Sequence, residues 1–325
     1  MAEWFKAAVL KTVELERVPG VRIPSSPPAF ARAYFVDASF GWAGERGHAG
    51  FVDASFGWAH SDSARQATWR RARATESLMD DPRVRRWLGA LEARHLASLT
   101  PSEAARALRA LSSCYVERRA RLAAGGALDS AGKRAAFALF YAPLHFLVTR
   151  EVVRAVNAAP GIFALTDLGC GTGAAGAAWA LECAACDVTG ADRNAWATAE
   201  AQWTYRTLGL RGRAFKADID GMRLSAGAGR AILAAYSVNE LPDPVRAALL
   251  PRLVEAHQQG TRILIVEPIA RRLATWWTGW EKAFTAAGGT SREWRFAVPL
   301  PERQHQLGRA AGLDPRELTA RSLWL

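Results

Sequence analysis

The chain has 325 residues, of which 50% are hydrophobic and 22% are charged, so it is long enough for a sizeable core and for two domains. Four cysteines are too few for a disulfide framework, and neither a membrane-span-length apolar run nor a signal peptide is evident. We therefore expect a cytoplasmic protein without a membrane partner. The net charge is +11, and residues 61–160 hold 17 basic against 9 acidic residues, which favours an anionic partner such as RNA.

Residues 1–60 do not resemble part of a folded domain. The segment up to Pro28 is similar to a translation of a bacterial serine tRNA gene, and the string FVDASFGWA occurs at 35–43 and again at 51–59. Two identical copies without drift indicate a recent DNA duplication rather than a structural repeat. We expect residues 1–60 to be poorly ordered and non-native, with the true start at Met79 or shortly before it; a short amphipathic helix is the alternative.

Helical patterns follow from about residue 61 to residue 158, which we assign to a helical cap. Apolar residues recur with helical spacing at Val84, Trp87, Leu88 and Leu91. Residues 100–103, Thr-Pro-Ser-Glu, form a capping box that predicts the start of a second helix. A third helix is expected from Asp129 or Ser130 through 135–141, kinked or broken at Pro143 and continuing over 144–156.

Tyr141 and His145 lie one turn apart on this last helix, directly ahead of a glycine-rich segment. Two interpretations stay open at this point. The pair either closes over a bound cofactor or substrate, or packs in the core with the imidazole hydrogen-bonded internally.

A strand, a glycine turn and a helix follow in succession. Residues 162–166 are apolar and run into Asp167-Leu-Gly-Cys-Gly-Thr-Gly173, and 174–184 is rich in alanine. Glycines allow a turn that side chains would block, and the N–H groups at a helix start bind polar ligand atoms. The segment therefore predicts a site for a nucleotide-like ligand.

Further strands are expected at 187–192, 213–219, 231–236 and 262–266, followed by a tryptophan-rich helix that ends near Gly288 and a final hairpin of 293–298 with 318–325. In such a sheet, ligands bind beyond the carboxyl ends of the strands. Asp192 ends the second strand, where its carboxylate can accept both hydroxyl protons of a ribose. Residues 237–242 follow the fourth strand and should face the reaction centre.

The string Asp-x-Gly-x-Gly-x-Gly at 167–173 resembles motif I of class I S-adenosylmethionine (SAM)-dependent methyltransferases. The resemblance implies an enzyme with SAM as cofactor and an α/β fold, a doubly wound Rossmann-like sheet over 159–325 behind the N-terminal helical cap. The final hairpin agrees with it. The cofactor-binding residues that it implies are Asp167, Gly169, Cys170, Gly171, Gly173, Asp192, Arg193, Asp218, Ile219 and Tyr236.

Two other assignments stay open. Gly171, Gly173 and Gly176 also match the short dinucleotide fingerprint, which would make the protein an NAD-dependent oxidoreductase. Residues 235–242 and the Glu267-Pro268 pair resemble, more weakly, the small-ribosomal-subunit methyltransferase-like family. That resemblance implies a role with rRNA or the ribosomal small subunit, including one as a catalytically inactive SAM-binding assembly factor. The family's iron–sulfur cysteines are missing after Cys186, and we expect no metal site.

Methyl transfer from an activated donor needs mainly in-line placement, with a general base where the acceptor is a hydroxyl or a protonated amine. Glu240 is the candidate base, with Asn239 and Tyr236 as orienting groups. The alternative for Glu240 is a helix cap or a salt bridge. The acceptor is either RNA or a small molecule, because the sequence does not distinguish them.

Overall fold

A computed structural model describes residues 81–97, 99–117, 128–269, 274–297, 299–313 and 317–325 of the chain. The expectations for residues 1–60 and for a start near Met79 therefore lie outside the described residues.

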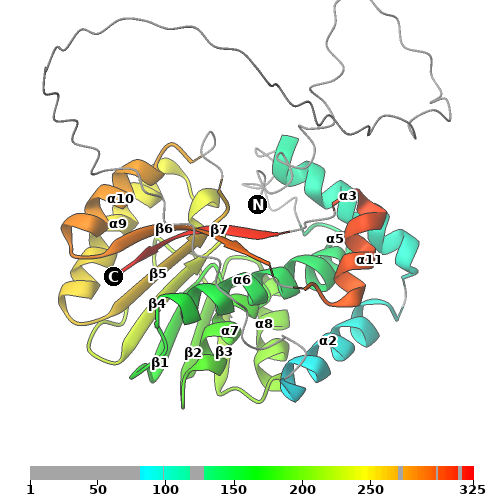
Figure 1. The fold of residues 1–325 in the computed structure, drawn as a ribbon, viewed down its shortest axis with the longest axis horizontal. Coiled ribbons are helices and arrows are strands. Elements are labelled where there is room, and N and C mark those ends of the chain that lie inside the picture. The colour runs from blue at the N-terminus through cyan, green and yellow to red at the C-terminus, as the bar shows by residue number, and fades with distance from the viewer. Residues whose placement is uncertain (1–80, 98, 118–127, 270–273, 298, 314–316) are drawn as a thin grey trace, which may run out of the picture. The chain divides into compact units, whose positions relative to one another are not determined.

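A seven-stranded sheet in the order β3-β2-β1-β4-β5-β7-β6 forms the centre of the fold (Figure 1). Its strands are β1 (Ala164–Leu168), β2 (Asp187–Asp192), β3 (Gly212–Lys216), β4 (Arg230–Ala235), β5 (Arg262–Glu267), β6 (Thr290–Phe296) and β7 (Leu318–Trp324). Strands β1 to β5 pair in parallel, and β7 is antiparallel to both of its neighbours. The predicted doubly wound, Rossmann-like α/β sheet is confirmed.

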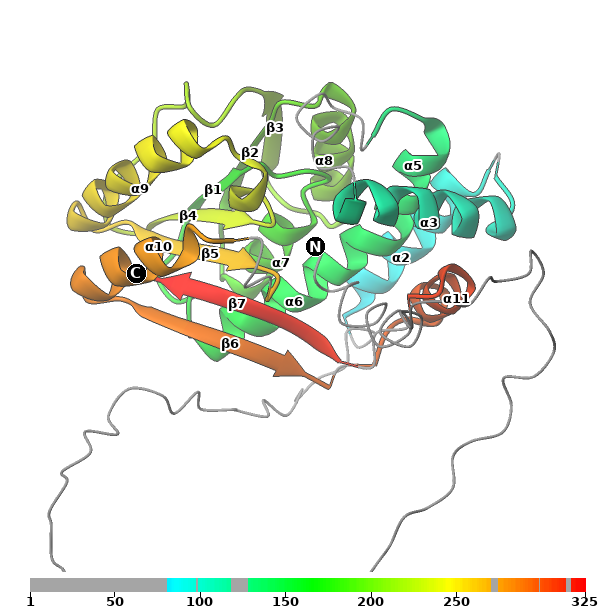
Figure 2. The same cartoon turned by 90° about the horizontal axis from the view of Figure 1, so that it is seen from above.

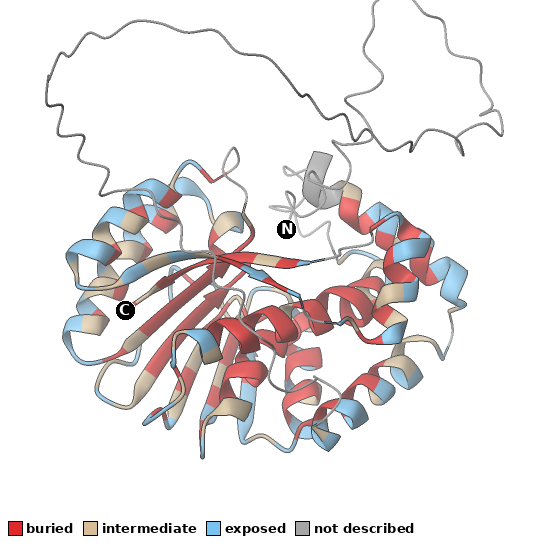
Figure 3. Ribbon diagram, in the orientation of Figure 1, coloured by how far each residue is buried: buried red, intermediate tan, exposed pale blue. Residues whose placement is uncertain are grey.

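Helices cover both faces of the sheet, as a parallel sheet requires. Helices α6 (Ala142–Ala155), α7 (Ala174–Glu182) and α8 (Ala195–Thr207) lie on one face, and α9 (Asp243–Gln258) and α10 (Trp277–Ala286) lie on the other (Figure 2). The inner strands β4 and β5 are buried nearly throughout, as is α6 (Figure 3). This explains the continuous apolar runs 231–235 and 263–266 in the sequence.

The helices ahead of β1 share their hydrophobic core with the sheet. They begin with α2 (Pro82–His95), where Asp81 caps the first turn, and α3 (Pro101–Glu117), where Thr100 and Glu103 form the predicted capping box. Arg94 at the end of α2 forms an ion pair with the buried Glu200 of α8 at 2.8 Å. These contacts fix the N-terminal helices to the face of the sheet that α8 covers.

The helix around Pro143 is continuous. Helix α5 (Ala131–Ala136) runs through a π-helical turn, η2 (Phe137–Tyr141), directly into α6, so of the kink or break expected at Pro143 the break is absent, and the helix continues as predicted. Proline offers no N–H to the carbonyl of Leu139, one turn earlier. The side chain of Gln304, from α11 (Glu302–Ala311), donates to that carbonyl at 2.8 Å instead.

The stretch from Ala131 to Ala155 is long and apolar enough to cross a membrane, but 94% of its most apolar window is buried inside the protein. That burial is what a core helix shows.

Two boundaries and one connection differ from the sequence prediction. Strand β3 ends at Lys216, so Asp218 and Ile219 lie in the loop 217–229, which contains no helix. Strand β6 covers Thr290–Phe296 rather than 293–298. The antiparallel pair β6–β7 is present, but α11 is inserted between its strands, so it is not a simple hairpin. Helix α11 packs against α3 and η2, a long-range contact that no local pattern signals.

Candidate functional site

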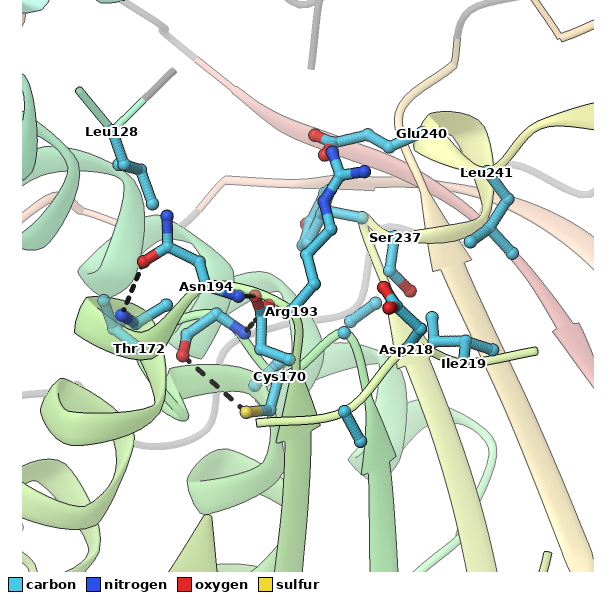
Figure 4. A pocket seen from close by; sticks show the side chains of 18 of the residues that line it. Leu128, Cys170, Thr172, Arg193, Asn194, Asp218, Ile219, Ser237, Glu240 and Leu241 are labelled. Carbon is cyan, nitrogen blue, oxygen red and sulfur yellow. Dashed lines mark hydrogen bonds between the residues drawn. The ribbon is translucent and has the colours of Figure 1, made fainter. Parts of the chain in front are cut away.

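A cavity of about 270 Å³ opens at the carboxyl ends of the parallel strands (Figure 4). Its walls come from the glycine turn after β1, the ends of β2 and β4, the loop after β3 and the helices η2, α6 and α9. Residues far apart in the sequence therefore meet here, as the doubly wound topology predicts.

The glycine turn after β1 lies against β2. Gly169 and Cys170 both donate their backbone N–H to the carbonyl of Ala191, at 2.8 and 2.9 Å. A Cβ on Gly169 would stand 2.5 Å from the Cβ of Ser237, and the residue has φ of 69°, so only glycine fits this crossing point. Gly169, Cys170 and Gly171 line the cavity.

Asp167 and Gly173 lie behind the turn, not in the lining of the cavity. The Asp167 carboxylate is 1% exposed and accepts the backbone N–H of Gly176 at 3.0 Å, which fastens β1 to the first turn of α7. Burial raises the pKa of Asp167 to about 7. Gly173 is the left-handed residue that begins α7. Both residues shape the site from outside.

Asp192 connects the end of β2 to the glycine turn. One carboxylate oxygen accepts the N–H of Gly171 at 3.0 Å, and the other accepts that of Asn194 at 2.8 Å. Asn194 in turn caps α8 and also lines the cavity. Burial raises the pKa of Asp192. Two carboxylate oxygens carry about four acceptor positions, so Asp192 retains capacity for two further donors.

The loop after β3 and the residue after Asp192 complete this end of the cavity. Asp218 is exposed and Ile219 is 9% exposed, and both line the cavity, with Ile219 next to Gly169 of the glycine turn. The side chain of Arg193 extends across the cavity toward Glu240 (Figure 4).

Tyr236, directly after β4, has an unusual backbone. Its φ is 59°, a left-handed conformation that costs energy in a residue other than glycine and clusters at functional sites. Its ring stacks on the imidazole of His145 with centroids 4.0 Å apart and planes 13° apart. Burial lowers the pKa of His145 to about 3, so its imidazole is neutral at physiological pH.

The alternatives for Tyr141 and His145 thus separate in the structure. His145 lines the cavity, where it supports Tyr236, while Tyr141 is buried at 2% exposure behind it.

Glu240 and Asn239, both predicted at the reaction centre, lie on opposite sides of the short 3-10 turn η3 (Val238–Glu240). Glu240 lines the cavity and is exposed to it, and no described residue forms a hydrogen bond or ion pair with its carboxylate. The surrounding protein and the nearby Glu267 carboxylate raise the pKa of Glu240 to about 7, although water in the open cavity screens part of this effect. Asn239 points away, and both ends of its amide are occupied by Glu267 and Trp276.

The sequence prediction gave no individual role to two residues of this site, although Ser237 lies in the segment 237–242 that was expected to face the reaction centre. Ser237, which donates to the carbonyl of Leu168 at 2.8 Å, and Asn194 both line the cavity. Asn194 had a usable signal, because an asparagine ahead of an alanine-rich helix is a common N-cap. The sequence around Asn239 does not indicate its hydrogen-bond partners, because Glu267 and Trp276 lie 28 and 37 residues further along the chain.

Metal-binding clusters of three or more His, Cys, Asp or Glu side chains are not found in the part of the chain that the structure describes. Cys170, Cys183 and Cys186 are free thiols.

Comparison with known proteins gives one family match. Residues 165–260 match the family model of a methyltransferase domain. A search of curated proteins found no significant match.

Solved structures similar to the chain include three proteins of low sequence identity. The YcgJ protein of Bacillus subtilis is 12% identical, with TM-score 0.37 and coverage of 55% of this chain and 96% of that one. The mitomycin 7-O-methyltransferase MmcR is 15% identical, with TM-score 0.42 and coverage of 76% and 69%. An O-methyltransferase from neocarzinostatin biosynthesis is 16% identical, with TM-score 0.35 and 55% coverage of both chains. At this level, the similarities carry no information about an acceptor.

The family match spans β1 to the end of α9, which includes the glycine turn, Asp192 and the segment 236–241. Residues 165–260 of the chain therefore correspond to a methyltransferase domain.

Proposed function

We propose that the cavity binds SAM and that the protein transfers its methyl group to a nucleophile held beside Glu240. The observation that carries this proposal is the 3.0 Å hydrogen bond between Gly171 and Asp192. It joins the glycine turn and the acid of β2 in one cavity, which Asp218 and Ile219 also line. One cavity thus contains the backbone donors of the glycine turn, the carboxylate of Asp192 for the ribose, and Asp218 with Ile219 for the adenine.

The residues present fit SAM. A Cβ built on Gly171 finds its nearest neighbour, the Phe137 ring, at 3.8 Å, so a larger side chain would occupy the space above the turn. Ala174 and Ala175 open α7 and line the cavity. Backbone N–H groups at such a position have no partner within the helix and suit a carboxylate like that of a methionine moiety. Asp192 would accept the ribose hydroxyls, and Asp218 and Ile219 would flank adenine.

When bound, SAM supplies a methyl group on a positively charged sulfur. The remaining tasks belong to this chain. Glu240 is placed to accept a proton from the acceptor, and a carboxylate with a pKa near neutrality is suited to that task. Tyr236, held by the His145 ring, would orient the acceptor from the end of β4. Arg193 supplies a positive charge near the Glu240 carboxylate.

RNA and small molecules both remain candidate acceptors. The basic surplus over 61–160 supports RNA. A cytoplasmic location agrees with the free thiols of Cys170, Cys183 and Cys186. The resemblance of 235–242 to ribosomal methyltransferase-like proteins supports a second candidate, a SAM-binding factor in assembly of the small subunit. The antiparallel β7 between β5 and β6 argues against an oxidoreductase, because the dinucleotide sheet has its strands in the order 3-2-1-4-5-6.

Calorimetry with SAM, its demethylated product and NAD tests the cofactor. Binding of SAM and its product but not NAD is expected, and NAD binding alone would contradict the proposal. Incubation with methyl-labelled SAM and either total RNA or a small-molecule extract then tests the transfer. Label in one fraction identifies the acceptor class, whereas tight SAM binding without transfer to either would favour the assembly factor.

A further inference from the structure

The turn that carries Glu240 is held from behind by a buried network. The Glu267 carboxylate, at the end of β5, is 0% exposed. One of its oxygens accepts the backbone N–H of Asn239 at 3.0 Å, and the other accepts the side-chain Nδ2 of Asn239 at 2.9 Å. A buried charge is costly unless it is hydrogen-bonded, so this two-point contact strongly favours one position of the turn.

Trp276 and Arg246 extend the network to the other end of the turn. The indole Nε1 of Trp276 donates to Oδ1 of Asn239 at 2.9 Å, which fixes the orientation of the amide. Arg246 lies over the Trp276 ring, 5.4 Å from its centroid, and donates to the carbonyl of Leu241 at 2.7 Å. The turn is therefore bound on both sides of Glu240, while the Glu240 carboxylate itself faces the cavity.

We propose that Glu267 is a positioning residue, which acts through Asn239 to hold Glu240 at the cavity wall and places a second negative charge behind it. This inference rests on the proposed function in one respect, that Glu240 is the group that acts on the acceptor. Neither Glu267 nor Trp276 lines the cavity, so neither is expected to contact SAM or acceptor. Trp276 affects the site through the turn, and Glu267 affects it both through the turn and through its charge.

The charged surroundings of Glu240 define what the second carboxylate does. Glu267 from β5 and Asp192 from β2 raise the pKa of Glu240, in addition to the effect of burial, and Arg193 lowers it. His145 on α6 is neutral. Burial raises the pKa of Glu267, and the charge of Arg321, its register partner on β7, opposes that rise. Neutralising Glu267 thus removes one repulsion from Glu240 and leaves the effect of the surrounding protein in place.

The first test is Glu267→Gln, followed by carbon-13 NMR of the full chain labelled at its glutamate carboxyl carbons. The Glu240 signal is assigned by its loss in Glu240→Gln. We expect the pKa of Glu240 to fall in the Glu267→Gln variant and to stay unchanged in Glu255→Gln, which neutralises an exposed carboxylate on α9. An unchanged Glu240 pKa in Glu267→Gln would overturn the proposal.

The second test uses the direction of the hydrogen bonds. In Glu267→Gln, the new amide group faces that of Asn239, so Asn239 must turn and lose its bond from Trp276. The proton signal of the Trp276 indole N–H, assigned with Trp276→Phe, should then move. The double variant Asn239→Asp with Glu267→Gln exchanges amide and carboxylate and can restore all three bonds. Recovery of the indole signal supports the network, and no movement in the single variant refutes it.

Trp276→Phe covers the case in which Glu267→Gln does not fold. It removes the indole N–H together with the five-membered ring and keeps a six-membered aromatic ring at this position. Amide hydrogen exchange over 238–241 should speed up, and unchanged exchange there would count against the network. These measurements use the protein without SAM, so failure of the chain to bind SAM would refute the proposed function and leave this inference standing.

Discussion

Replacement of Asp192 by alanine is expected to weaken SAM binding by about 10² to 10⁴-fold. A hydrogen bond to a charged acceptor contributes about 1.5–3 kcal/mol, and two ribose hydroxyls would make two such bonds, or about 3–6 kcal/mol together. Each 1.4 kcal/mol corresponds to a factor of ten in Kd. The variant also frees the N–H groups of Gly171 and Asn194, which Asp192 now holds at 3.0 and 2.8 Å, so the turn loses support.

Isothermal calorimetry with SAM measures this effect directly. The matched control is Asp187→Ala at the other end of β2, where the carboxylate is 60% exposed and pairs with Arg211, which is 72% exposed. An exposed pair contributes about 1 kcal/mol or less, and it lies away from the cavity, so the Kd should change less than about twofold. Asp192→Asn keeps the side-chain size and should fall between the two. A Kd within threefold of the unaltered protein in Asp192→Ala would refute the assignment of the cavity.

Three further predictions concern stability, each measured by chemical denaturation. Gln304→Leu leaves the buried carbonyl of Leu139 without its donor and should lower the free energy of unfolding by about 1–3 kcal/mol. Gln304→Glu should lower it at least as much, because an ionised glutamate cannot donate a hydrogen bond either. Asp167 has a pKa of about 7 in the folded protein, above its value in the unfolded chain, so the folded state binds more protons. The free energy of unfolding should therefore fall by up to about 4 kcal/mol as the pH rises from about 4 to 7. Asp167→Asn should remove this pH dependence. A slope that persists in the variant would rule out Asp167 as its source. Gly173→Ala should lower the free energy of unfolding more than Gly209→Ala does. Both glycines have positive φ, but only at Gly173 would an added Cβ meet atoms of α8, at 2.9 to 3.0 Å. An equal decrease in the two variants would show that the contact with α8 is unimportant.

The sequence alone determined the parts of this protein that depend on short-range patterns. The succession of apolar strands, the glycine turn at 167–173 and the acid at Asp192 fix a doubly wound sheet with a cavity at its carboxyl edge. These features are local because a parallel strand buried on both faces must be apolar, and a turn that crosses a neighbouring strand closely must be glycine. The same patterns indicated Glu240 and Tyr236, which the fold brings to the cavity.

Only the tertiary structure decided the direction in which each side chain points. Asp167 and Gly176 form a contact behind the turn, and Asn239 faces Glu267 rather than the cavity, although neighbouring residues line it. The sequence around Pro143 predicts a kink or a break, and the helix is not broken; Gln304, 161 residues downstream, donates to the carbonyl of Leu139, to which proline has no N–H to offer. Such partners come from distant elements whose approach depends on packing of the whole core, and no local pattern encodes that approach.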